Sequence, residues 1–136
     1  MTYPRKGIYC AGDWQIIVIC ILMTESDINI RVRLDDQKVP EQISWSASSS
    51  TADTPQKAKA MVVALWDAAD KTALRIDLWT KDMMIDEMAD FYFQVFSTMA
   101  DTFQRATKHE ELSRDIKEFA RKFHKKFTEI EKQKNG

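Results

Sequence analysis

Glycine is nearly absent from this chain, and its scarcity excludes whole classes of nucleotide-binding site. Only Gly7, Gly12 and Gly136 occur among the 136 residues, so the body of the chain has none. Phosphate-binding loops of the P-loop and dinucleotide-binding types need glycine, because a side chain would hold the backbone away from the phosphate. The sequence therefore predicts no nucleotide cofactor.

Cysteine and histidine are equally scarce. Cys10 and Cys20 both lie near the N-terminus, which excludes a disulfide framework in the body and fits a reducing compartment. The two histidines, His109 and His124, are fifteen residues apart with no cysteine nearby. Because metal sites need several such ligands at close, recurring spacings, we expect no metal site and no other cofactor.

Carboxylates gather at one place, where Asp86, Glu87 and Asp90 lie near the predicted start of a helix. The positive end of the helix dipole already explains acidic residues there. General acid–base catalysis needs a carboxyl with a shifted pKa in a cleft, and no other pattern in the sequence indicates one. We therefore expect no catalytic residue and a protein that is not an enzyme.

The first 22 residues differ from the rest. Their apolar run, Trp14–Leu22, has nine residues, whereas a membrane-spanning helix needs about 17–25. Asp13 and the lack of a small-residue cleavage pattern weaken the case for a signal peptide. A cleaved signal, an amphiphilic extension and a misplaced start before Met23 all stay open, and we prefer the misplaced start. We divide the chain into an N-terminal extension, 1–22, disordered or a mis-assigned start, and a single domain, 23–136.

Side-chain periodicity predicts strands in the first half of the domain. Apolar and polar residues alternate over Ile28–Leu34, which is typical of a half-buried strand, and Glu41–Ala47 follows as a second strand. The apolar run Ala58–Asp67 would suit either a helix or a buried strand. We favour the strand because the alternating segment Thr72–Thr80 follows closely and completes a hairpin.

After Thr80 the period changes from two to about 3.6. Thr80 or Asp82 is the candidate N-cap of a helix that we expect to lie against the sheet or another subunit. The predicted apolar stripe of this helix is Ile85, Met88, Tyr92, Val95, Phe96, Met99 and Phe103. A second helix follows a break near 107–109. The predicted fold is α+β, with an antiparallel sheet of about four strands followed by two C-terminal helices packing on it.

One tryptophan occupies an unexpected strand phase. Trp79 alternates with Arg75 and Asp77 and not with the apolar residues of its strand, and tryptophan is enriched in protein interfaces. We therefore predict a candidate interaction surface made of Arg75, Asp77, Trp79, Lys81 and Asp82. The open alternative is that the second helix or a partner strand covers Trp79.

Four strings resemble the GldC family of gliding-motility-associated proteins from the Bacteroidetes lineage. They are VPEQISW at 39–45, AKAMVVALWD at 58–67, RIDLWTKDM at 75–83 and MADTFQRAT at 99–107. The resemblance implies a GldC-like α+β domain in a cytoplasmic accessory protein of gliding motility. Its partners would be proteins of the gliding or associated secretion machinery, and it carries over no catalytic residues.

Two hypotheses for the molecular role remain open. The first is an interaction module, which acts by protein–protein contact, and the second is a SecB-like chaperone for exported or motility-machinery proteins. Either could be a homo-oligomer. A net charge of −1 gives no general attraction to nucleic acid, and no apolar run is long enough for a membrane span, so we expect neither.

Overall fold

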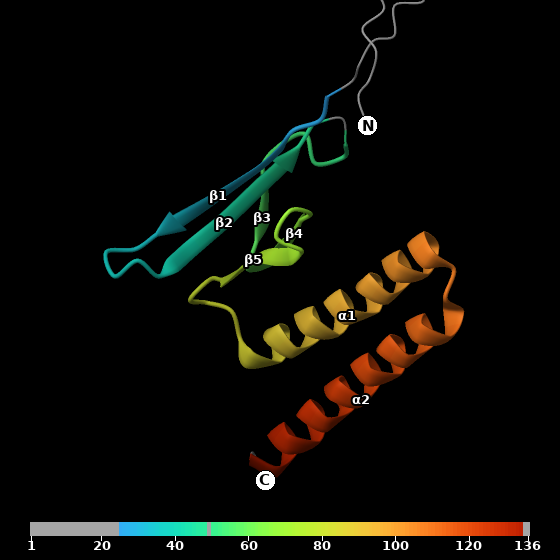
Figure 1. Cartoon of the computed structure of the whole chain (residues 1–136). Helices are drawn as coiled ribbons and strands as arrows, with labels where there is room; N and C mark the ends of the chain where they lie inside the picture. The colour runs from blue at the N-terminus through green and yellow to red at the C-terminus, as the bar shows by residue number, and fades with distance from the viewer. Residues whose placement is uncertain (1–24, 49, 135–136) are drawn as a thin grey trace, which may run out of the picture.

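The computed structural model describes residues 25–48 and 50–134, and its α+β architecture agrees with the prediction (Figure 1). The predicted N-terminal extension, 1–22, lies outside the described residues. Strands come first and helices last, in the order β1 (Ile28–Leu34), β2 (Pro40–Ala47), β3 (Gln56–Ala58), β4 (Ala60–Asp67), β5 (Thr72–Trp79), α1 (Ile85–Thr107) and α2 (Glu110–Lys134).

All strand pairs are antiparallel, but they form two sheets where the sequence predicted one. The sheets have the orders β1-β2-β3 and β4-β5. The predicted strand 58–67 is interrupted at Lys59, whose carbonyl accepts a hydrogen bond from the Thr80 backbone N–H at 2.7 Å. Before this point the chain pairs with β2, and after it with β5. A bond from the Lys81 N–H to the Pro40 carbonyl at 2.9 Å links the two sheets again.

The prediction that Thr80 or Asp82 caps the first helix is wrong. Thr80 is buried, and its hydroxyl donates to the Lys59 carbonyl at 3.2 Å, so it belongs to the sheet. The helix begins at Ile85 after Met84, whose backbone N–H donates to the Glu87 carboxylate at 2.9 Å. A carboxylate from inside the first turn therefore satisfies the N-terminal N–H group.

The two helices lie side by side as an antiparallel hairpin (Figure 1). Small residues let them approach closely, because Ala89 and Ala100 of α1 and Ser113 and Ala120 of α2 are all buried. Aromatic rings flank this contact: Phe96 meets Phe119 and Phe123 edge-on, with centroids 5.5 and 5.6 Å apart. The predicted stripe of α1 is thus only partly covered, and Ile85 and Met99 remain exposed.

The core of the described chain is small. Its buried apolar residues are Ile43, Ala52, Ala89, Ala100 and Ala120, of which only Ile43 is large. Many large apolar side chains on both sheets are exposed instead. Since soluble monomers bury most of such surface, these side chains indicate where another molecule can bind.

Candidate interaction surface

The structure separates the five predicted surface residues into two neighbouring groups. Arg75, Asp77 and Trp79 lie on β5, whereas Lys81 and Asp82 lie in the loop that leads from β5 to α1. Their role in binding stays a prediction, and the contacts that each group makes define what it offers to a partner.

On β5, Arg75 and Asp77 form an ion pair on one side of the strand. The Arg75 Nε donates to the Asp77 Oδ1 at 2.9 Å. This hydrogen bond lowers the pKa of Asp77 below its usual value and raises the pKa of Arg75, to which the Tyr92 hydroxyl adds a smaller effect. Because Tyr92 belongs to α1, the polar side of β5 is turned toward that helix.

Trp79 shares this side of β5 and is 54% exposed. It lies opposite Ala60 in the β4–β5 ladder, a residue too small to cover the indole ring. Neither α2 nor another described strand therefore hides Trp79, in contrast to the alternative that the sequence left open.

The opposite side of the β4–β5 sheet is apolar and open. The ladder sets Met61 opposite Leu78, Val63 opposite Ile76 and Leu65 opposite Leu74, and we call these six residues the open face. Leu65, Leu74 and Ile76 are 62%, 59% and 54% exposed. Sequence reasoning missed this face as a binding surface, because its alternation was interpreted as the side that faces the core.

The apolar surface continues from the open face onto the first sheet. A shallow hollow between β1, β2 and β4 is lined by Ile28, Ile30 and Trp45 and by residues from both sides of β4, among them Met61 and Val63 of the open face and Val62 of the other side. The side chains of Ile28, Ile30 and Trp45 are themselves exposed. Both sheets therefore contribute to one extended apolar area.

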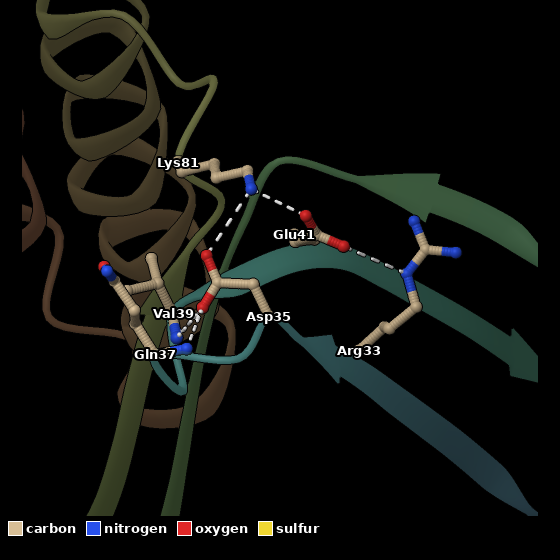
Figure 2. Close-up of polar contacts among 6 residues, drawn as sticks. All are labelled: Arg33, Asp35, Gln37, Val39, Glu41 and Lys81. Carbon is tan, nitrogen blue, oxygen red and sulfur yellow. Dashed lines mark hydrogen bonds and ion pairs between the residues drawn. The ribbon is translucent and has the colours of Figure 1, made fainter.

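Lys81 connects the turn after β1 with the loop before α1 (Figure 2). Its Nζ donates to Glu41 at 2.6 Å and to Asp35 at 3.4 Å, and Arg33 lies 3.6 Å from the other oxygen of Glu41. The hydrogen bond that Lys81 donates to Glu41 is the largest cause of the raised pKa of Lys81. Exposed ion pairs contribute little individually, so this network orients the loop more than it stabilises the fold.

Asp35 organises the turn at the other end of this network. Its Oδ1 accepts the backbone N–H groups of Gln37 and Val39, both at 2.9 Å. The bond from Val39 is the largest cause of the lowered pKa of Asp35. Asp35 therefore holds the turn in shape while Lys81 binds its second oxygen.

Asp82 interacts within its own neighbourhood. The nearby Thr80 side chain is the main cause of its lowered pKa. Next to it, Lys59 donates to both oxygens of Glu87, at 2.8 and 2.9 Å. Lys81 and Asp82 are thus engaged in contacts that fix the β5–α1 loop.

The resolved pKa shifts of the described carboxyl groups all have the same direction. Every carboxyl group with a resolved shift has a lowered pKa, as expected for ion pairing and opposite to what a general acid needs. In the same part of the chain, no group of three or more metal-ligating side chains comes together. No helix among residues 25–134 has the length and apolarity needed to cross a membrane.

A comparison with known families decides where the chain belongs. The family described as gliding motility-associated protein GldC-like matches residues 40–129, which is more than half of the chain. The chain belongs to the GldC-like family. The matched part of this GldC-like protein begins at the start of β2 and ends within α2, so it includes β2 to β5, α1 and most of α2. No curated protein and no solved structure matches the chain.

Proposed function

We propose that this GldC-like chain is a cytoplasmic, non-enzymatic accessory protein of bacterial gliding motility that acts by binding another protein. The family match supports the link to gliding. The observation that carries a binding role is the open face, where Leu65, Leu74 and Ile76 expose more than half of their surface side by side. The partner would be a protein of the gliding or associated secretion machinery.

The energetics favour a protein partner with an apolar surface of its own. Burying one large apolar side chain contributes roughly 1.5–3 kcal/mol, so covering the open face would provide a strong driving force. Arg75 and Trp79 lie on the other side of the same two-stranded sheet, and Lys81 lies in the loop after β5, so polar groups are available at the edges of this face. An apolar centre with a polar rim is the usual arrangement of a protein interface.

The test is complementation of a non-gliding strain that lacks this protein. Leu65→Asp places a charge in the open face at an already exposed position, so the variant is expected to fold and to glide poorly. Gln133→Asp, which adds the same charge at an exposed site on α2, is the matched control and should restore gliding. Full gliding with folded Leu65→Asp would remove the open face as the functional surface.

The alternative function is a SecB-like chaperone for exported or motility-machinery proteins. The observation that favours it is the spread of exposed apolar side chains over both sheets, which would suit extended, unfolded clients. The order of strands followed by helices is similar to that of SecB-type chaperones, although this is an analogy of fold alone. The purified chain would then suppress aggregation of several unrelated unfolded proteins, and Leu65→Asp would do so less well. Binding to one folded partner only would contradict this alternative.

A further inference from the structure

We propose that β5 pairs with β5 of a second copy of this chain, antiparallel and about a two-fold axis at Ile76. Among the described residues, no strand pairs with the outer edge of β5 over its eight residues, and β2 meets this edge only past Trp79, where Pro40 accepts the Lys81 N–H. The strand has no proline, and its ladder with β4 has no bulge. Unprotected edges of this kind present free N–H and C=O groups that another strand can use.

The ladder determines which backbone groups point outward. The Thr80 N–H donates to the Lys59 carbonyl, so the Thr80 backbone points toward β4. Backbone direction alternates along a strand, so the N–H and C=O groups of Leu78, Ile76, Leu74 and Thr72 also point toward β4. The remaining residues, whose backbone groups face the free edge, are Ala73, Arg75, Asp77 and Trp79. An antiparallel β5 strand from a second copy would bond to these groups and add about eight backbone hydrogen bonds.

Charge selects a single central register for this pairing. An axis at Ile76 sets Arg75 opposite the partner's Asp77, and Asp77 opposite the partner's Arg75, which gives two ion pairs across the interface. Moving the axis by one residue sets either Arg75 opposite Arg75 or Asp77 opposite Asp77. Since like charges directly opposite one another destabilise a sheet, the register at Ile76 is the self-complementary one of these three central registers.

The apolar side chains agree with the same register. Ile76 meets its own copy on the axis, and Leu74 lies opposite the partner's Leu78, so the two open faces join into one surface. On the other side of the sheet, Ala73 lies opposite Trp79, which pairs the smallest side chain of the strand with the largest. Pairs of this kind stabilise neighbouring strands.

The free edge of β1 does not share this property. Arg31 and Arg33 lie on one side of β1, with Val32 between them. An axis at Arg31, Val32 or Arg33 always sets an arginine opposite an arginine. Two copies therefore have an electrostatic reason to join through β5 and not through β1.

The experiment measures the solution mass of the full chain by light scattering and sedimentation. The wild type is expected at twice 15.8 kDa. Arg75→Asp and Asp77→Arg each set like charges opposite one another, so each should raise the dimer dissociation constant by about tenfold or more. Arg105→Asp, with the same charge change at an exposed arginine of α1, is the control and should keep the wild-type mass.

An equimolar mixture of Arg75→Asp and Asp77→Arg gives the decisive result. The first variant has two acids and the second two bases at these positions, so the mixture should form heterodimers although neither variant pairs with itself. Both variants lack the ion pair within the chain, so recovery reports contacts between copies. A monomeric wild type, single variants that stay dimeric, or a mixture that remains monomeric would overturn the proposal. None of these outcomes affects the binding role of the open face, which Leu65→Asp tests separately.

Discussion

Ser113 and Ala100 join the two helices through a buried hydrogen bond. The Ser113 hydroxyl of α2 donates a hydrogen bond to the Ala100 carbonyl of α1 at 2.9 Å, and both residues are buried. A larger side chain at either position would separate the helices, so size and hydrogen bonding act together here.

Substitutions at Ser113 should separate these two effects. Ser113→Ala removes the hydrogen bond but keeps the close approach, so the free energy of unfolding should fall by about 0.5–1.5 kcal/mol. Ser113→Leu also forces the helices apart and should cost more, on the order of 1–3 kcal/mol beyond the hydrogen bond. Urea unfolding followed by circular dichroism measures both. Equal losses for the two variants would show that close packing at this point is unimportant.

Acid should destabilise the fold through its paired carboxyl groups. Asp35 has an ordinary pKa of 3.8 and a lower one in the folded chain, chiefly because Val39 donates a backbone hydrogen bond to it. The unfolded chain therefore binds the proton first as the pH falls through 3.8, which favours unfolding. The stabilisation is complete above this value and is lost as the pH falls through the folded pKa.

Asp35→Asn provides the comparison for this pH dependence. The variant should be less stable than the wild type at neutral pH, and the gap should narrow as the pH falls below 3.8. The measurement is the urea midpoint at a series of pH values. A gap that is constant with pH would mean that Asp35 does not contribute through its charge.

The sequence predicted the strands better than the long-range contacts that connect one element to another. Strand Ile28–Leu34 has the predicted bounds, because a strict alternation of apolar and polar residues is typical of a strand and does not fit a helix. The interruption at Lys59 was not predictable, since its carbonyl bonds to Thr80, which is 21 residues away. Because the Thr80 hydroxyl also donates to this carbonyl, Thr80 does not cap the helix.

For the candidate surface, periodicity identified the two sides of β5 but not which side is covered. Arg75, Asp77 and Trp79 were placed on one side correctly. Leu74 and Ile76, which alternate with these residues, lie on the other side and are open. A pattern within one strand cannot show which of its sides a later helix approaches, and here Tyr92 of α1 comes near Arg75 on the polar side.

At the end of α1, Lys108 occupies a position where glycine is usually found. Lys108 adopts a left-handed conformation with φ 63°, and its N–H donates to the Gln104 carbonyl at 2.8 Å. Glycine is the favoured residue at such a helix end, because a Cβ atom costs about 1–2 kcal/mol in this conformation. Lys108→Gly should therefore raise the melting temperature, although the extra freedom of glycine when unfolded offsets part of the gain.

A β-branched residue at the same position should act in the opposite direction. Lys108→Val keeps the left-handed strain and adds crowding, so it should melt below the wild type. Scanning calorimetry of the three chains gives the order glycine, lysine, valine. If Lys108→Gly melts below the wild type, the lysine side chain stabilises this turn by a contact that outweighs backbone strain.

Glu87 connects the start of α1 to the sheet by two separate interactions. Its carboxylate accepts the Met84 backbone N–H at 2.9 Å and also binds Lys59 at 2.8 Å, and the Lys59 bond is the largest cause of its lowered pKa. Glu87→Gln can keep the cap but loses the ion pair, whereas Glu87→Ala loses both. The alanine variant should therefore be the less stable of the two, and Lys59→Met should resemble the glutamine variant.

Salt separates the two interactions further. Raising the ionic strength screens the ion pair, so the difference between wild type and Glu87→Gln should shrink. The difference between Glu87→Gln and Glu87→Ala should persist, because a helix cap is a short hydrogen bond that salt screens weakly. Urea midpoints of the variants at low and high salt measure both differences. Two differences that vanish together in salt would mean that Glu87 acts only through its charge, and that the cap at Met84 contributes nothing.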